Sequence, residues 1–130
     1  EAHTLNVESF QSYGASQIKR WGYSPDAFVQ MAIQLATFRL FGEQAGTYEA
    51  TQVRTFLHGR TEVTRAVTSA SGAFVKRMGE RPHETVVSKE AARLEKLEKV
   101  TLLGKAVAAH VAYMRDAARG HGVDRHLFGL

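Results

Sequence analysis

The chain has 130 residues, a mass of 14.4 kDa and no cysteine, and its 17 Lys and Arg against 13 Asp and Glu give a formal charge of +4. This length accommodates one domain at most, and the hydrophobic fraction of 44% and charged fraction of 23% exclude disordered and fibrous classes. The absence of cysteine excludes a disulfide framework, a thiol nucleophile and a thiolate zinc site.

The first two predicted elements are short. Apolar and polar residues alternate between residues 5 and 10, which predicts a half-buried strand. Tyr13 and Gly14 interrupt this pattern. Residues 15–21 then predict a short basic helix that carries Lys19 and Arg20.

A longer helix is predicted to begin at Ser24. Ser24 can cap it, Pro25 has the φ angle of a first helical residue, and Asp26 meets the positive end of the helix dipole. Gly42 ends it. Its apolar residues form two stripes on different faces, which predicts burial on both, with partners for any buried glutamine. The stripes are Phe28, Met31, Leu35 and Phe38, and Val29, Ile33, Ala36 and Leu40.

The remaining elements alternate between strand and helix character. Residues 47–56 are mixed, His58 and Gly59 predict a turn, and residues 61–68 are rich in the Thr and Val typical of a strand. A short helix is expected over 70–78, a linker over 79–83, and a long helix from Ser88 to Ala118 with a Glu95–Lys99 pair on its solvated side. Asp124 is expected to cap a last helix. The pattern predicts an α+β fold that is predominantly helical with short strands.

Both ends of the chain predict a piece of a larger protein. The sequence starts at Glu1 rather than Met and stops at the apolar residues 127–130. It contains no apolar run of the roughly 20 residues that a membrane span requires.

Histidines are the first candidates for chemistry. None of the six belongs to an HExxH pair, and without cysteines or nearby paired carboxylates we expect no metal site. The six are His3, His58, His83, His110, His121 and His126. No nucleophile elbow and no phosphate-binding glycine loop is present either.

The basic residues indicate an anionic ligand. Lys19 and Arg20 precede a helix N-terminus, where phosphate oxygens can meet cationic groups and backbone N–H groups together, although a solvated basic turn has the same pattern. Arg54, Arg60 and Arg65 surround the Thr-rich stretch and could face a carboxylate, a phosphate or water. They do not cluster as a nucleic-acid-binding face requires, so no nucleic-acid partner is expected.

Four sequence blocks, in order, carry a resemblance to a known family. They are Ser24–Leu40 (SPDAFVQMAIQLATFRL), Thr47-Tyr48-Glu49, Gly59-Arg60-Thr61-Glu62 and Asp124-Arg125-His126-Leu127. The chain resembles the choline/carnitine acyltransferases, and within them the carnitine acetyltransferases. The resemblance implies a two-domain enzyme whose halves each have the two-layer fold of chloramphenicol acetyltransferase. Residues 1–130 would be one partial domain of it, from the central or C-domain region.

The resemblance also implies which residues bind substrate. Tyr48, Thr61 and Arg125 match the family's ligands for the carnitine carboxylate, and Arg125 could alternatively pair with Asp124 or Glu49. Choline acetyltransferases carry an apolar residue and an amide in place of Thr61 and Arg125, so this pair favours carnitine. The catalytic histidine would lie before Glu1 and a Ser-Thr-Ser segment after Leu130, which leaves no catalytic residue in this chain.

The implied CoA contacts are only partly retained. Lys19 matches one of two lysines that contact the CoA 3′-phosphate, whereas Ala15 and Gly22 stand where relatives have lysine; Arg20 is a candidate substitute. Asp26 and Glu49 also match family motif residues, with capping and packing as their expected roles.

The function implied is the reversible transfer of an acyl group, with acetyl preferred, between CoA and carnitine. CoA is a cosubstrate, and no other cofactor is expected. The remaining half of the same enzyme would be a partner, peripheral membrane association is possible, and the family implies mitochondria or peroxisomes. Two alternatives stay open, which are a non-enzymatic helical interaction module and a basic nucleic-acid-binding domain.

Overall fold

A computed structural model describes residues 3–79 and 88–130 as five helices and a two-stranded sheet. The helices are α1 (Ala15–Arg20), α2 (Pro25–Phe41), α3 (Ser69–Gly79), α4 (Lys89–Ala118) and α5 (Asp124–Phe128), and the strands are β1 (Glu49–Gln52) and β2 (Thr61–Thr64). The predicted α+β class, mainly helical with short strands, is confirmed.

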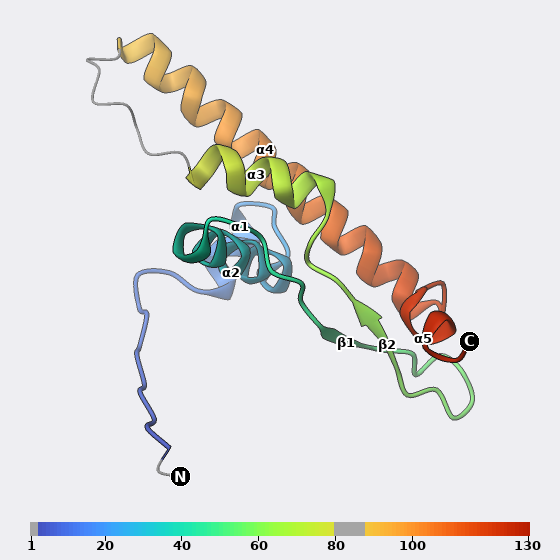
Figure 1. Ribbon diagram of the computed structural model, residues 1–130. Helices are drawn as coiled ribbons and strands as arrows, with labels where there is room; N and C mark the ends of the chain where they lie inside the picture. The colour runs from blue at the N-terminus through green and yellow to red at the C-terminus, as the bar shows by residue number, and fades with distance from the viewer. Residues whose placement is uncertain (1–2, 80–87) are drawn as a thin grey trace.

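Helix α4 is the element along which the others are arranged (Figure 1). Its 30 residues give a length of roughly 45 Å. Helices α2 and α3 pack against α4 and against each other, the β1–β2 hairpin contacts α4 toward the end that carries α5, and α5 packs on β2. No helix in the described ranges 3–79 and 88–130 combines the length and the apolar character that a bilayer span requires.

The core lies where α2, α3 and α4 meet. It consists of buried residues from these helices and from the segment after β2, namely Ala27, Met31, Ala66, Phe74, Val75, Ala106 and Val107. The small alanines let the helix axes approach, and the larger side chains fill the space between them. This core fixes α2 and α4, and the hairpin is carried on α4.

The helix ends agree with the sequence signals. Ser24 Oγ accepts the backbone N–H of Ala27, and Gly42 ends α2 in the left-handed conformation with φ of 80°. Ser88 caps α4 in the same way through Ala91. Glu95 and Lys99 form the expected pair, with 2.6 Å between Oε1 and Nζ.

The predicted strand over residues 5–10 is wrong. Residues 3–10 are irregular, and Leu5 and Val7 are 86% and 83% exposed. A strand needs a neighbour for its backbone hydrogen bonds, and both described strands pair with each other. Alternation alone therefore did not produce a strand here.

Helix α2 buries one of its two apolar stripes. Met31 is fully buried, whereas Val29, Ile33 and Leu40 on the other face are 48%, 47% and 74% exposed. Burial of both faces is therefore not observed within the described chain. The buried polar residue of this helix, Gln34, accepts a hydrogen bond from Gln44 Nε2 at 3.1 Å, as expected for a buried amide.

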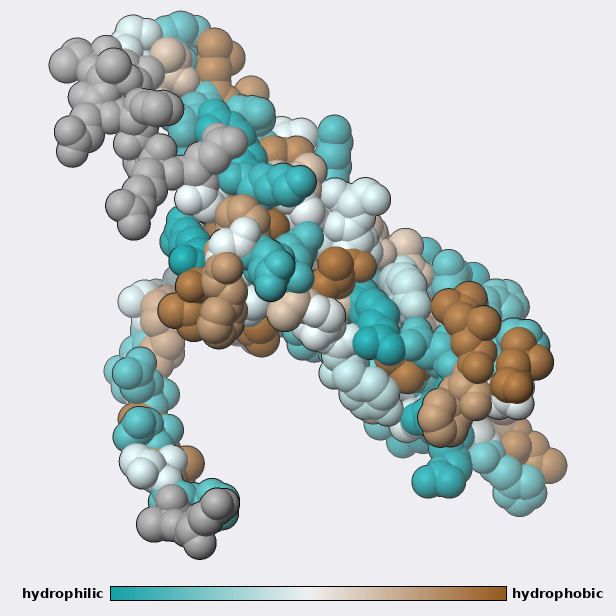
Figure 2. Space-filling model, viewed as in Figure 1, coloured by the Kyte–Doolittle hydropathy of each residue, from teal (hydrophilic) through white to brown (hydrophobic). Residues whose placement is uncertain are grey.

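Further apolar side chains are exposed at the end of the molecule that carries α5. Figure 2 shows brown residues gathered at this end, where Figure 1 places α5 and the C-terminus. The exposed apolar residues are Phe56 and Leu57 in the connection between β1 and β2, and Leu127, Phe128 and Leu130 in and after α5.

Candidate functional site

The β1–β2 hairpin places Tyr48 and Thr61. The strands pair antiparallel with Glu49 opposite Thr64 and Gln52 opposite Thr61, so Tyr48 immediately precedes β1 and Thr61 begins β2. The turn between them requires Gly59, because a Cβ there would lie 2.0 Å from the carbonyl oxygen of Val53. Tyr48 and Thr61 therefore lie toward opposite ends of a short ribbon.

Helix α5 brings Arg125 onto the same hairpin. Arg125 Nη2 donates to Tyr48 Oη at 3.2 Å and to Thr61 Oγ1 at 3.3 Å. Four residues of strand span roughly 13 Å, and the convergence depends on the length of the arginine and tyrosine side chains. The structure thus brings together the three residues matched to a carboxylate site, which we call the Arg125 site.

The Arg125 site presents hydrogen-bond donors to solvent. Arg125 is exposed and Tyr48 is 59% exposed. Both hydroxyls already accept a hydrogen bond from the guanidinium, so each can direct its own proton toward a ligand. Among the described residues Nε and Nη1 of Arg125 have no hydrogen-bond partner, so their N–H groups remain available as donors. Such a set of donors suits a carboxylate, which only accepts.

The charge of Arg125 is not neutralised by its neighbour in the sequence. Asp124 instead forms an ion pair with Arg65, whose Nε also donates to Asp124 Oδ1 at 3.2 Å. This hydrogen bond from Arg65 holds the pKa of Asp124 below its ordinary value. The alternatives in which Arg125 pairs with Asp124 or Glu49 are not observed in the described part of the chain. The expected cap by Asp124 is also absent, because its carboxylate is committed to Arg65 and α5 has no side-chain cap.

Lys19 and Arg20 lie in a different part of the molecule. They occupy the exposed last turn of α1, which packs on α2 near its N-terminus, whereas α5 packs on β2. Figure 1 shows α1 and α5 well apart. The two predicted binding regions therefore belong to separate elements, an arrangement that is compatible with two different ligands.

A cluster that local spacing did not reveal joins the exposed Asp26, the partly buried Glu49 and the buried His110. Nε2 of His110 lies 3.5 Å from Glu49 Oε2 and 3.8 Å from Asp26 Oδ2. His110 is fully buried, and neither of its ring nitrogens has a hydrogen-bond partner in the described chain. Burial lowers the pKa of His110 and raises that of Glu49, which Asp26 raises further.

This cluster corrects the expectation that no histidine lies near paired carboxylates. One ligand atom from each of the three residues lies within 4.8 Å of the others, a spacing at which such groups can hold a cation. The expectation failed because α2, β1 and α4 supply one residue each. Residues so far apart in the sequence do not form a local motif. Asp26 and Glu49 consequently have surroundings beyond the capping and packing roles expected of them.

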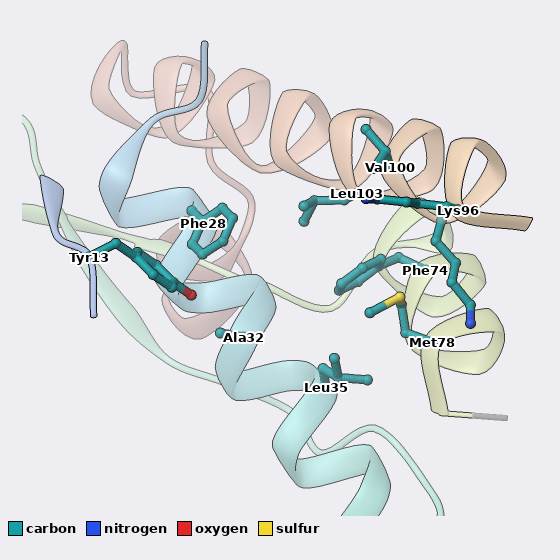
Figure 3. Close-up of a pocket in the computed structure, with 10 residues that line it drawn as sticks. Tyr13, Phe28, Ala32, Leu35, Phe74, Met78, Lys96, Val100 and Leu103 are labelled. Carbon is teal, nitrogen blue, oxygen red and sulfur yellow. The ribbon is translucent and has the colours of Figure 1, made fainter. Parts of the chain in front are cut away.

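An apolar pocket of about 400 Å³ opens between α2, α3 and α4. Figure 3 shows Phe28, Phe74 and Leu103 directed into it, one from each helix. None of its lining residues belongs to the Arg125 site. The pocket is a gap in the helix packing, and Lys96 and Lys99 of α4 are the charged residues among those that line it.

Comparison with known proteins relates the chain to one family. The family model described as Choline/Carnitine o-acyltransferase matches residues 1–130. The mitochondrial carnitine O-acetyltransferase of Saccharomyces cerevisiae is 41% identical over 128 residues, which cover 98% of this chain and 18% of that protein. The carnitine O-acetyltransferase of Mus musculus is 42% identical over 122 residues, covering 94% of this chain and 18% of that protein.

Relatives with other substrates are similarly close. The muscle isoform of carnitine O-palmitoyltransferase 1 of Homo sapiens is 44% identical over 121 residues, covering 93% of this chain and 14% of that protein. The chain thus spans less than a fifth of the length of these curated relatives. Overall identity does not separate acetyl from palmitoyl transfer, and individual residues must carry any assignment of specificity.

Proposed function

The chain belongs to the choline/carnitine O-acyltransferase family, and we propose that it forms the carnitine-binding part of a carnitine O-acyltransferase. The full-length protein would transfer an acyl group reversibly between CoA and L-carnitine. The observation that supports this proposal is the convergence of Arg125 on the hydroxyls of Tyr48 and Thr61. Carnitine carries a carboxylate, and choline does not.

Binding of the carboxylate would contribute to rate as well as affinity. The Arg125 site fixes one end of the substrate, so the hydroxyl at its centre is held at a defined distance from the site. Holding the hydroxyl in a fixed orientation beside the catalytic base makes the reaction step effectively unimolecular, which increases its rate. A histidine outside residues 1–130 would act as general base on that hydroxyl, or on the CoA thiol in the reverse reaction.

CoA would be bound in part by α1. Lys19 and Arg20 are exposed cations on its last turn. We propose that Lys19 binds the CoA phosphate and that Arg20 substitutes for the lysines absent at positions 15 and 22. We propose acetyl as the preferred acyl group, supported by the carnitine acetyltransferases among the relatives. The same set includes a palmitoyltransferase, so chain length needs its own measurement.

The remaining part of the same enzyme is the proposed partner of the exposed apolar surfaces. The outer stripe of α2, with Val29, Ile33 and Leu40, has the character of an internal face. A mitochondrial or peroxisomal location is proposed from the family, supported by the yeast relative named as mitochondrial.

The test is an acyl-transfer assay on the full-length protein with L-carnitine and CoA esters of two, eight and sixteen carbons. We expect carnitine-dependent release of CoA, with the highest kcat/KM for acetyl-CoA. Highest kcat/KM for a longer ester would overturn the acetyl preference alone. No transfer to carnitine with any of the esters would overturn the proposed function.

A further inference from the structure

Each side chain of the Arg125 site has a sequence neighbour that ties the three segments together. These neighbours are Thr47, Glu62 and Asp124, and Arg65 joins two of them. We propose that Glu62 and Arg65 are positioning residues for carboxylate binding, which hold the Arg125 guanidinium against Tyr48 and Thr61. This inference rests on the proposed function of the Arg125 site.

Helix α5 has little else to hold it. It is five residues long, contains no buried residue and has no side-chain cap. Among the described helices and strands, it packs against β2 only. The orientation of Arg125 must therefore come from specific polar contacts between α5 and the hairpin, because apolar burial does not supply it.

The first contact runs through the carboxylate of Glu62. Its Oε1 accepts the backbone N–H of Arg125 at 3.2 Å and that of Val63 at 2.7 Å. One buried oxygen thus joins the residue after Thr61 to the main chain of Arg125. Gly122 makes room for this arrangement, because a Cβ there would lie 2.2 Å from Glu62 Cγ.

The second contact runs through the guanidinium of Arg65. Nη1 donates to the carbonyl oxygen of Thr47 at 3.0 Å, while Nε and Nη2 donate to Asp124. Thr47 Oγ1 in turn accepts the backbone N–H of Ala66 at 2.9 Å. Arg65 therefore fixes the residue before Tyr48 relative to the residue before Arg125, and only a planar fork can reach both acceptors at once.

Arg65 has a second consequence for the site. By pairing with Asp124, it keeps that carboxylate from the adjacent Arg125, whose positive charge stays available to a ligand. Glu62 sets the backbone position of Arg125, and Arg65 sets both the hairpin geometry and the local charge. Neither residue needs to touch the substrate for these roles.

The experiment compares full-length enzyme variants by the KM for carnitine, the KM for acetyl-CoA and the thermal unfolding midpoint. The variants are Glu62→Ala, Glu62→Gln and Arg65→Met, with Arg93→Met as the matched control at an exposed position on α4. We expect Glu62→Ala and Arg65→Met to raise the carnitine KM by about 10- to 100-fold, the scale for a displaced binding group. The KM for acetyl-CoA should stay unchanged, and Glu62→Gln, which keeps an acceptor oxygen, should restore most of the carnitine affinity.

Two further variants keep the test decisive. The double variant Arg65→Met/Asp124→Asn removes the carboxylate that Arg65→Met leaves free. We expect its carnitine KM to lie between those of Arg65→Met and the wild type, because the charge effect of Arg65 is then restored and its effect on the hairpin geometry is not. If Glu62→Ala does not fold, Gly122→Ala displaces the Glu62 side chain without changing any charge, and the same rise in carnitine KM is expected.

The outcomes separate the two proposals. A wild-type carnitine KM in folded Glu62 and Arg65 variants, together with a raised one in Arg125→Asn, would overturn the positioning roles alone. An equal loss for carnitine and acetyl-CoA would also overturn them, because it indicates general distortion. An unchanged carnitine KM in Arg125→Asn would contradict the proposed function itself.

Discussion

Arg125 donates to the hydroxyl of Tyr48 across 3.2 Å although 77 residues separate the two in the chain. The same nitrogen donates to Thr61 Oγ1, which lies 64 residues away. The guanidinium, with two hydroxyls that accept from it, forms a surface of donors on an exposed part of the hairpin and α5.

Replacing Arg125 should affect carnitine and spare CoA. We expect Arg125→Asn in the full-length enzyme to raise the carnitine KM roughly 10- to 100-fold, because hydrogen bonds to a charged group contribute about 1.5–3 kcal/mol. Steady-state kinetics with each substrate varied in turn measures both values. A raised acetyl-CoA KM with normal carnitine KM would reject this role for Arg125.

Replacing Lys19 should give the opposite pattern. Lys19→Ala should raise the CoA KM about two- to fivefold, since an exposed charge pair contributes up to about 1 kcal/mol. The effect should disappear with dephospho-CoA, which lacks the 3′-phosphate. Lys105→Ala, at an exposed position on α4, is the matched control. An effect that persists with dephospho-CoA would remove Lys19 from the phosphate contact.

The polar contact between α2 and α3 should contribute to stability. Gln44 Nε2 donates to Gln34 Oε1 at 3.1 Å and to Ser71 Oγ at 3.2 Å, and both acceptor side chains are buried. Gln44→Leu should therefore lower the free energy of unfolding by about 1–3 kcal/mol, the cost of a buried polar group without its partner.

The double variant Gln34→Leu/Gln44→Leu should recover part of that loss, because it removes one of the stranded acceptors as well. Urea unfolding of the full-length protein measures both changes. A double variant no more stable than Gln44→Leu would show that Gln34 is not the group left unsatisfied.

Acidification should destabilise the fold through His110. Burial lowers its folded pKa below the ordinary value of 6.5, so the unfolded chain binds a proton on this histidine before the folded chain does. Stability is then lost as the pH falls from about 6.5 toward the folded pKa. Glu49 and Asp26 face His110, and the raised pKa of Glu49 acts in the opposite sense because its folded form takes up a proton first.

The measurement is the change in unfolding free energy between pH 7.5 and 5.5. His110→Gln should reduce the loss seen on acidification, whereas His126→Gln, at an exposed position on α5, should not change it. An equal loss in the wild type and in His110→Gln would show that another group titrates.

Local sequence signals were sufficient to predict the helices, whereas contacts between residues distant in the sequence, including strand pairing, could not be predicted from them. Ser24 and Gly42 marked the ends of α2 because capping involves only the adjacent turns. Residues 5–10 had the alternation of a strand but no described neighbour to pair with. The strand that was expected over 61–68 ends at Thr64, where its pairing with β1 ends.

The same distinction between local signals and distant contacts applies to the candidate site. Tyr48, Thr61 and Arg125 could be named because each lies in a sequence block that resembles a family motif. The cluster around His110 could not, because its members come from three elements and none is informative alone. In the sequence Arg65 is one of several arginines near a threonine-rich stretch, and only the fold shows its contacts with Thr47 and Asp124.

The most direct test of carnitine recognition is the ratio of kcat/KM for carnitine to that for choline, measured with acetyl-CoA in the full-length enzyme. The wild type should favour carnitine strongly, because only carnitine carries the carboxylate that Arg125 and the two hydroxyls can bind. The double variant Thr61→Val/Arg125→Asn should lower this ratio by at least about 100-fold, mainly through a higher carnitine KM. A ratio that stays at the wild-type value would contradict carboxylate binding at this site.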